Sequence, residues 1–310
     1  MNINQNVLIF LCFFSLSTFG TTVSAIDSAA GATGTPSIYD ASNMTYYGIY
    51  EKNGINLKEG MWTGQSVLMG GASRPRAGLI KDFTFTGDIG NNGIEDRVVF
   101  LWESTGGTGS WLYMAIIGNR DGKLINLATH LIGDRVQLIM GRVNQGKIEL
   151  DVIQTGKGDA ACCPTSKTLR TWSLGTDKKN HKLIEHKPQV LGHISLADLE
   201  GIEWTMTQMN WHDTLAENAK ITMTFKDDKI SGGSGCNRYF ASVKTGEMPN
   251  DITFSQAGGT RMACPGDAMK LETRFLKALS SVNKYSFVNG QLALTWKNGD
   301  EVSVMLFKAQ

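Results

Sequence analysis

The chain has 310 residues, of which 30 are Lys or Arg and 29 are Asp or Glu, so its formal net charge is +1. No basic stripe stands out, and neither nucleic acid nor an anionic membrane surface is therefore an expected partner. The length suits two domains, and 35 glycines against 6 prolines, with many short β-branched runs, predict a β-rich globular protein with tight turns.

The first 25 residues, Met1 to Ala25, have the pattern of a cleaved secretory signal. An apolar run at Val7–Phe14 precedes small residues at Val23–Ala25, and this run is too short for a comfortable membrane span. We therefore expect an exported mature chain without a transmembrane span, which stays in a periplasm, associates with the outer envelope or is secreted. Of the 5 cysteines, only Cys12 lies in the signal segment. The even number that remains favours disulfides.

Residues 46–175 are predicted to form a β-rich domain of unknown role, after a flexible lead at residues 26–45. Runs of β-formers alternate with Gly, Asn and Asp turns, and no amphipathic helix interrupts them. The expected strands are Tyr46–Tyr50, Leu79–Phe85, Arg97–Trp102, Trp111–Gly118, Lys123–His130, Arg135–Val143, Lys147–Gln154 and Leu169–Leu174. Their number and spacing predict an antiparallel sandwich or barrel.

One loop of this domain, residues 88–96, has oxygen ligands at the spacing of an EF-hand-like calcium site. Asp88, Asn92 and Asp96 stand at the first, fifth and ninth places, and Gly93 stands at the sixth. Gly90 occupies the third place, where an oxygen ligand is usual, and no distal Glu follows. The loop is therefore either a calcium site, with calcium as the one candidate cofactor, or an Asx turn that joins two strands.

Two adjacent cysteines, Cys162 and Cys163, follow Asp159 near the end of this domain. They can form a vicinal disulfide, pair elsewhere or remain thiols. The neighbouring Asp159 disfavours a reactive thiolate. A zinc site is not indicated, because no second Cys-x-x-Cys and no close His pair accompanies them.

Residues 176–193 turn polar and are predicted as a linker, in which His181, His186 and His193 are expected to be solvated. Residues 194–310 then form a second domain. Between Gly266 and Val282 the apolar residues recur every three to four positions, which predicts one amphipathic helix on a sheet. The expected strands are Lys220–Lys226, Lys229–Ser231, Asn237–Lys244, Asp251–Ser255, Thr260–Cys264, Lys284–Val288, Gln291–Trp296 and Glu301–Phe307. The fold class is thus mainly β with one amphipathic helix (α+β), built as two antiparallel sandwich- or barrel-like domains.

The second domain carries six segments of a known pattern. They are Leu199–Trp204, Ile221–Phe225, Ser234–Tyr239 with its Gly-Cys-Asn corner, Thr260–Cys264, Glu272–Leu279 and Gln291–Thr295. In this order they resemble the META domain of the heat-shock-inducible, HslJ-like family. The resemblance implies an exported or envelope protein related to stress, with no agreed chemistry. It also makes Cys236 and Cys264 natural disulfide partners, which favours a vicinal bond between Cys162 and Cys163 over pairing elsewhere or free thiols.

The corner at Cys236 is the candidate site of this domain. Asn237, Arg238 and Tyr239 form either a polar binding corner or a turn in which Asn237 satisfies backbone groups and Tyr239 packs. Ser234 lacks the strand-to-helix setting of a nucleophile elbow. A disulfide would also remove the thiol that His212 could activate. We therefore expect no catalytic residues.

These observations predict an exported, non-enzymatic binding or structural protein of the cell envelope, with a protein or small molecule as its unidentified partner. One alternative is a thiol-dependent enzyme, or an inhibitor of enzymes, that uses Cys162 and Cys163. A calcium-stabilised adhesion module at Asp88, Asn92 and Asp96 is another.

Overall fold

The computed structural model describes residues 34–50, 53–66, 73–105, 109–160, 163–177, 180–210, 213–215, 220–299 and 301–310. The predicted signal segment, Cys162 and His212 lie outside these ranges. Within them the fold is mainly β with two α-helices, α1 (Ile38–Ser42) and α2 (Gly266–Leu279), which confirms the predicted β-rich α+β class. No helix in the described ranges is long and apolar enough to cross a membrane.

Two five-stranded antiparallel sheets make up the first part of the chain. The first sheet has the order β3-β4-β5-β6-β7, and the second has the order β11-β10-β9-β8, with β12 also paired to β10. The strands of the first sheet are β3 (Met61–Thr63), β4 (Arg76–Gly87), β5 (Asp96–Ser104), β6 (Trp111–Arg120) and β7 (Lys123–Asp134). Those of the second sheet are β8 (Gln137–Asn144), β9 (Lys147–Gln154), β10 (Ser166–Asp177), β11 (Asn180–Glu185) and β12 (Gln189–His193).

Hairpin turns set this order, because sequential strands joined by tight turns must pair with each other. Positive φ angles at Asp121 and Gly122, and again at Gln145 and Gly146, form the turns that match the twist of a two-residue hairpin. The two sheets meet along two seams, where β7 contacts β11 and β4 contacts β8. Their facing sides enclose one core, so the arrangement is the sandwich- or barrel-like form that the strand spacing predicts.

Strand β5 is buried on both faces, because the first sheet separates two hydrophobic cores. Val98 and Phe100 point into the core between the two sheets, while Val99 and Leu101 point to the opposite face. On that opposite face α1 and two short strands, β1 (Thr45–Tyr46) and β2 (Ile55–Asn56), cover the sheet. The described part of the predicted flexible lead, residues 34–45, therefore has structure: α1 starts at a Ser37 capping box, and Ala41 is fully buried.

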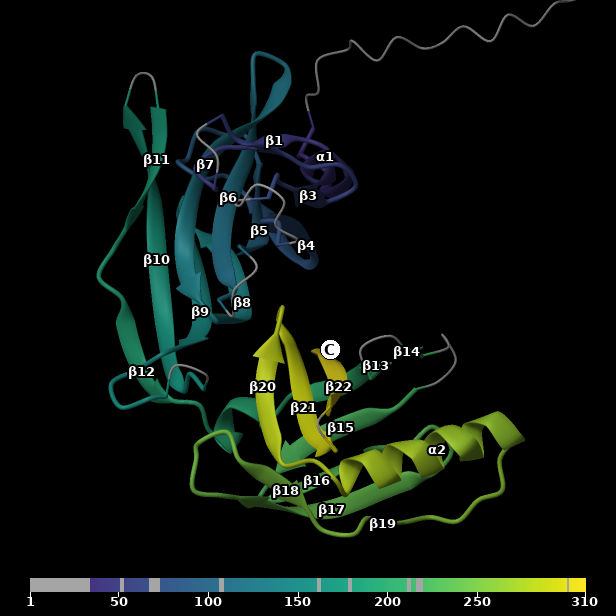
Figure 1. The fold of residues 1–310 in the computed structure, drawn as a ribbon. Coiled ribbons are helices and arrows are strands. Elements are labelled where there is room, and N and C mark those ends of the chain that lie inside the picture. The colour runs from purple at the N-terminus through teal and green to yellow at the C-terminus, as the bar shows by residue number, and fades with distance from the viewer. Residues whose placement is uncertain are drawn as a thin grey trace, which may run out of the picture. The chain divides into compact units, whose positions relative to one another are not determined.

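The polar composition of residues 176–193 was misleading, because this predicted linker contains β11 and β12. Figure 1 shows β11 beside one end of β10 and β12 beside the other. Every residue of β12 is exposed, and β11 alternates around the buried Leu183. Edge strands with one or both faces in water need few apolar residues, and composition alone therefore reads them as a linker.

The second part of the chain forms a ten-stranded sheet with the order β18-β17-β16-β15-β13-β22-β21-β20. Strands β14 and β19 pair with β13 and β17, and a short 3-10 helix, η1 (Leu196–Leu199), precedes the sheet. The strands are β13 (Glu203–Met209), β14 (Asp213–Thr214), β15 (Thr222–Lys226), β16 (Lys229–Gly233), β17 (Arg238–Thr245), β18 (Ile252–Phe254), β19 (Gly258–Gly259), β20 (Lys284–Val288), β21 (Gln291–Asn298) and β22 (Glu301–Ala309).

Helix α2 lies along this sheet, as the helical spacing predicts (Figure 1). Its buried residues are Phe275, Ala278 and Leu279, and the ring of Phe275 packs edge-on against that of Tyr239, with 5.1 Å between centroids. The strand predicted at Thr260–Cys264 is wrong. Before this segment Gly258–Gly259 forms β19 and pairs with β17, but residues 260–264 form no strand and are held by a side chain, as described below.

Candidate functional site

The Gly-Cys-Asn corner lies between β16 and β17, and glycine is required at two places in it. A Cβ on Gly232 would lie 1.9 Å from the carbonyl oxygen of Thr222, so the neighbouring strand can approach only a glycine. Gly235 has a φ of +97°, a conformation that other residues rarely adopt. The chain then closes its turn with a hydrogen bond from the N–H of Ser234 to the carbonyl oxygen of Asn237, at 2.8 Å.

A disulfide joins this corner to the segment before α2. Cys236 and Cys264 are bonded, with 5.9 Å between their Cα atoms and 28 positions between them in the sequence. The bond therefore ties the β16–β17 corner to the start of the helix across a long loop. Neither sulfur is available as a nucleophile while the bond is intact.

Asn237 satisfies the irregular segment that replaces the predicted strand. Its side-chain oxygen accepts hydrogen bonds from the N–H of Met262 at 2.7 Å and from the hydroxyl of Thr260 at 2.8 Å. Its side-chain nitrogen donates to Glu272 Oε1 at 3.1 Å and to the carbonyl oxygen of Met262 at 3.3 Å. The Asn237 side chain thus substitutes for the strand partner that residues 260–264 lack.

Glu272 connects α2 to the same corner. Its Oε2 accepts hydrogen bonds from the N–H of Asn237 at 2.8 Å and from the hydroxyl of Ser234. Burial acts to raise the pKa of Glu272, but the bonds from Ser234 and Asn237 outweigh it and hold the pKa below its ordinary value. The carboxylate is therefore charged at neutral pH and fully engaged in structure.

Tyr239 and Arg238 were predicted to belong to the corner, but their side chains do not take part in the Asn237–Glu272 hydrogen bonds. The Tyr239 side chain is buried, and its hydroxyl donates to the carbonyl oxygen of Thr222 at 3.0 Å. Arg238 is exposed on β17. The geometry is that of the structural alternative, in which Asn237 satisfies the backbone and Tyr239 packs.

A groove lies beside α2 on the second part of the chain, and we call it the α2 groove. It has a volume of about 970 Å³. Arg274 and Lys277 stand one helical turn apart on α2, and Lys297 on β21 faces the same space. The indole of Trp296 and the side chain of Met209 supply apolar surface. The remaining lining residues are Asn210, Ala278, Ser281, Glu301, Val302 and Ser303.

Charge in the α2 groove is unbalanced in favour of cations. Arg274, Lys277 and Lys297 are exposed, and among the lining residues that the structure describes Glu301 is the one carboxylate. An open groove with cationic walls and an aromatic surface suits an anionic ligand, because the walls supply charge and the indole supplies apolar contact.

The candidate calcium loop contains Asx-type hydrogen bonds, which a calcium site and a plain turn can share. Asp88 accepts hydrogen bonds from the N–H of Asn92 at 2.8 Å and of Gly93 at 2.9 Å, and Asn92 Oδ1 accepts from the N–H of Ile94 at 2.8 Å. Asp96, at the end of the loop, is fully buried, and burial raises its pKa to about 6 against the smaller lowering effects of Arg120 and the Ile89 N–H. No group of three or more His, Cys, Asp or Glu side chains gathers as a metal cluster within the described ranges.

The segment around Cys163 is folded around Asp159. Asp159 Oδ2 accepts from the N–H groups of Gly156 and Thr165, at 2.8 Å and 2.7 Å, and its Oδ1 accepts from the hydroxyl of Thr165. The Thr165 hydroxyl is also 2.9 Å from His193 Nδ1. These contacts engage the Asp, Thr and His side chains with one another and leave the role of Cys162 and Cys163 as a prediction.

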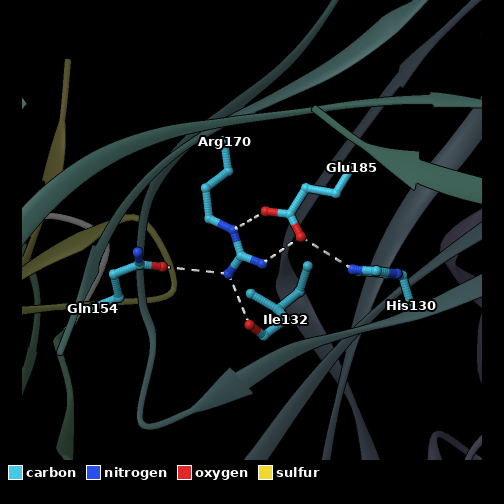
Figure 2. Close-up of polar contacts among 5 residues, drawn as sticks. All are labelled: His130, Ile132, Gln154, Arg170 and Glu185. Atoms are coloured by element: carbon cyan, nitrogen blue, oxygen red, sulfur yellow. Dashed lines mark hydrogen bonds and ion pairs between the residues drawn. The ribbon is translucent and has the colours of Figure 1, made fainter. Parts of the chain in front are cut away.

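A buried polar cluster stands at the seam between β7 and β11 (Figure 2). Arg170 on β10 binds both oxygens of Glu185 on β11, at 2.7 Å from Nε and 3.0 Å from Nη2. Its Nη1 donates to the carbonyl oxygen of Ile132 on β7 at 2.7 Å and to Gln154 at 3.4 Å. His130 Nε2 lies 3.4 Å from Glu185 on the other side. All three nitrogens of the guanidinium therefore donate hydrogen bonds that join strands of the two sheets.

Sequence reasoning missed both this cluster and the α2 groove. The signal for the first was present, because Arg170 and Glu185 have opposite charges and would face each other if residues 176–193 formed a hairpin with β10. The signal for the second was weaker. Arg274 and Lys277 lie on the polar face of the helix predicted between Gly266 and Val282, but nothing in the sequence shows that Trp296 and Lys297 lie beside that face.

Comparisons with known proteins concern the second part of the chain. Residues 197–310 match the family model of the META domain. A solved NMR structure of a protein from Burkholderia xenovorans is 26% identical, over 37% of this chain and 85% of that chain, with a TM-score of 0.31. No curated protein matches the chain. The family match supports a relation to stress and to the cell envelope. Residues 197–310 are therefore a META domain.

Proposed function

We propose that this protein is an exported, non-enzymatic binding protein of the cell envelope, and that its META domain binds an anionic ligand in the α2 groove. The observation that carries the proposal is the set of three cations, Arg274, Lys277 and Lys297, around one groove that also exposes an indole. The META match and the Cys236–Cys264 disulfide support an envelope location, because disulfides persist outside the reducing cytoplasm.

The hydrogen bonding of the corner supports a role without catalysis. Ser234, Asn237 and Glu272 bond to one another and to the backbone, and the two cysteines bond to each other. A nucleophile needs a positioned base and an approachable substrate. The corner uses its polar groups to hold the fold, whereas the α2 groove presents charged groups to solvent.

The ligand that fits best is a flexible anion with carboxylates spaced along it, such as an acidic peptide. The cations lie on two elements, α2 and β21, so a ligand with several charges can contact both at once. Each such contact is weak when exposed, at about 0.2–1 kcal/mol, and affinity must come from several together. Binding should therefore weaken as salt is added.

Titration of the protein with an oligo-glutamate peptide, followed by calorimetry, tests the proposal. We expect binding at low salt and none of an oligo-glutamine peptide of equal length. The double variant Arg274→Gln/Lys277→Gln should bind roughly three- to tenfold more weakly, because two exposed charge contacts are lost.

Lys270→Gln is the matched control, since Lys270 is exposed on the same helix and pairs with Asp267 outside the α2 groove. It should bind as the parent protein does. Equal binding of the neutral peptide, or an equal loss in Lys270→Gln, would contradict the assignment of the α2 groove as an anion site.

A further inference from the structure

Asp96 is a buried carboxylate that the fold does not explain. It stands at the first position of β5, its side chain has no exposed surface, and neither of its oxygens makes a hydrogen bond of acceptable geometry. Buried polar groups are nearly always hydrogen-bonded, and an ionised one without a partner is strongly disfavoured. A carboxylate kept in such a place calls for a positive partner.

The side chains around Asp96 make room for the carboxylate, and the positive charge of Arg120 acts on it from nearby, but no side chain hydrogen-bonds it. A Cβ on Gly118 of β6 would lie 2.3 Å from Asp96 Oδ1, so the neighbouring strand has space only because this residue is glycine. Arg120 instead donates to the carbonyl oxygen of Asn119 at 2.9 Å and lies 3.4 Å from His181 Nε2. Arg97 donates to Thr84 and to the carbonyl oxygen of Pro36.

The loop before Asp96 carries further oxygen atoms, those of Asp88 and Asn92. Asp88 lies close enough for its charge to act on Asp96, and the N–H of Ile89, next to Asp88, points toward the Asp96 carboxyl. Each oxygen of Asp88 accepts one backbone N–H, so each retains a second lone pair. The side-chain oxygen of Asn92 also accepts one hydrogen bond, from the N–H of Ile94, and also retains a second lone pair.

We propose that the loop from Asp88 to Asp96 binds one calcium ion, with Asp96 as the buried anchoring ligand and Asp88 and Asn92 as the other side-chain ligands. Oxygen donors of mixed charge and amide type are those that calcium prefers, and backbone carbonyls or water complete the shell in such loops. The ion neutralises the Asp96 charge and fixes β4 to β5 at this end of the sheet. The site is independent of the α2 groove, and either can be correct without the other.

Thermal unfolding with calcium chloride or magnesium chloride tests this assignment. A ligand that binds only the folded state raises Tm. We expect millimolar calcium to raise the Tm of the intact protein by several degrees, with affinity in the ~0.1–1 mM range of extracellular calcium modules. Magnesium at the same concentration should act much less, because two carboxylates and an amide in a flexible loop do not give its strict octahedron.

Asp96→Asn and Asp82→Asn form a matched pair of variants. Asp96→Asn removes the buried charge and should abolish the calcium shift, while its Tm without calcium should equal or exceed that of the parent protein. Asp82 is exposed on β4, and Asp82→Asn should keep the full shift. If Asp96→Asn does not fold, calorimetric titration of Asp88→Asn provides the same comparison. No shift in the parent protein, or a shift that survives in both Asp96→Asn and Asp88→Asn, would overturn the proposal.

Discussion

Glu272 reaches from α2 to the turn between β16 and β17, and three donors meet its two oxygens: the Ser234 hydroxyl, the Asn237 N–H and the Asn237 amide. A carboxylate accepts such bonds at all of its lone pairs, whereas an amide of the same shape presents an N–H where a donor already stands. The residue is thus chosen for its charge and its acceptor count, and its near-isostere Gln is a poor replacement.

Glu272→Gln should lower the free energy of unfolding by about 1–3 kcal/mol, because it leaves donors of the buried Ser234 and Asn237 without a full acceptor. Urea denaturation at neutral pH measures the loss. Asp267→Asn, a change at a fully exposed acid on the same helix, is the control and should cost less than about 1 kcal/mol. Equal effects of the two variants would show that the corner does not depend on the Glu272 carboxylate.

The same variant should also change the response to acid. Because the folded pKa of Glu272 is lowered, its stabilising effect is complete above the unfolded value of 4.5 and is lost as the pH falls through the folded value. The parent protein should therefore lose more stability than Glu272→Gln as the pH is lowered through and below 4.5.

At the residue scale the sequence shows which residues are unusual but not what they do. The Gly-Cys-Asn motif marks the corner, and the resemblance to the META domain marks Cys236 and Cys264 as partners. The role of Asn237 depends on Glu272, which lies 35 positions away. No local pattern predicts that a helix formed later in the chain will place an acceptor beside this turn.

The seam between β7 and β11 joins two sheets through side chains. Arg170, Glu185 and the carbonyl oxygen of Ile132 connect β10, β11 and β7, and the guanidinium carbon lies 4.9 Å from the ring centroid of Trp172 (Figure 2). The cluster is mostly shielded from water, because only 9% of the Arg170 side chain and 24% of the Glu185 side chain are exposed. A pair in this setting is costly to break from one side.

Arg170→Met should lower the free energy of unfolding by about 2–4 kcal/mol, because it leaves the Glu185 carboxylate and the Ile132 carbonyl without their donor. Arg142→Met is the matched control. Arg142 also binds two carboxylates, Glu149 and Asp151, but 42% of its side chain is exposed, and its loss should cost less than about 1 kcal/mol. The double variant Arg170→Met/Glu185→Leu should recover part of the loss. If Arg170→Met costs no more than Arg142→Met, the seam does not contribute to stability in this way.

Elements with one buried face could be predicted from the sequence, and elements without one could not. Runs of apolar β-formers between turn residues located β4 to β10 and β20 to β22 closely, because each of these strands has residues in a core. Strand β12 has no buried residue, and Thr260–Cys264 is alternating but irregular because Asn237 takes the place of a partner strand. A sequence pattern shows which residues are buried and not which residues pair as strands. Strand β12 was therefore missed, and a strand was wrongly predicted at Thr260–Cys264.

At the scale of the whole molecule, composition and turn signals were enough to predict a β-rich chain with a single long helix. The core of the META domain and the two cores of the first part are largely separate sets of residues, although Ile153 of β9 belongs to the META core. The α2 groove could not be predicted and the seam was missed, since both depend on which strands lie side by side. Hairpin turns fix neighbours in sequence, but not the closure of one sheet on another.

The export of the molecule and the state of its disulfide should change together. In the chain-entropy model, a bridge that closes a loop of 28 residues stabilises the fold by about 3–4 kcal/mol. The full chain, with residues 1–25, should be recovered outside the cytoplasm with Cys236 and Cys264 oxidised. The same chain made without residues 1–25 should remain in the reducing cytoplasm with both thiols free and a lower Tm. Fractionation, thiol counting and thermal unfolding of the two forms measure this. The variant Cys236→Ser/Cys264→Ser cannot form the bridge, so it should have the Tm of the reduced form in either compartment. A full chain retained in the cytoplasm with reduced cysteines would contradict both the predicted signal segment and the envelope role, because a binding protein of the envelope must first cross the membrane.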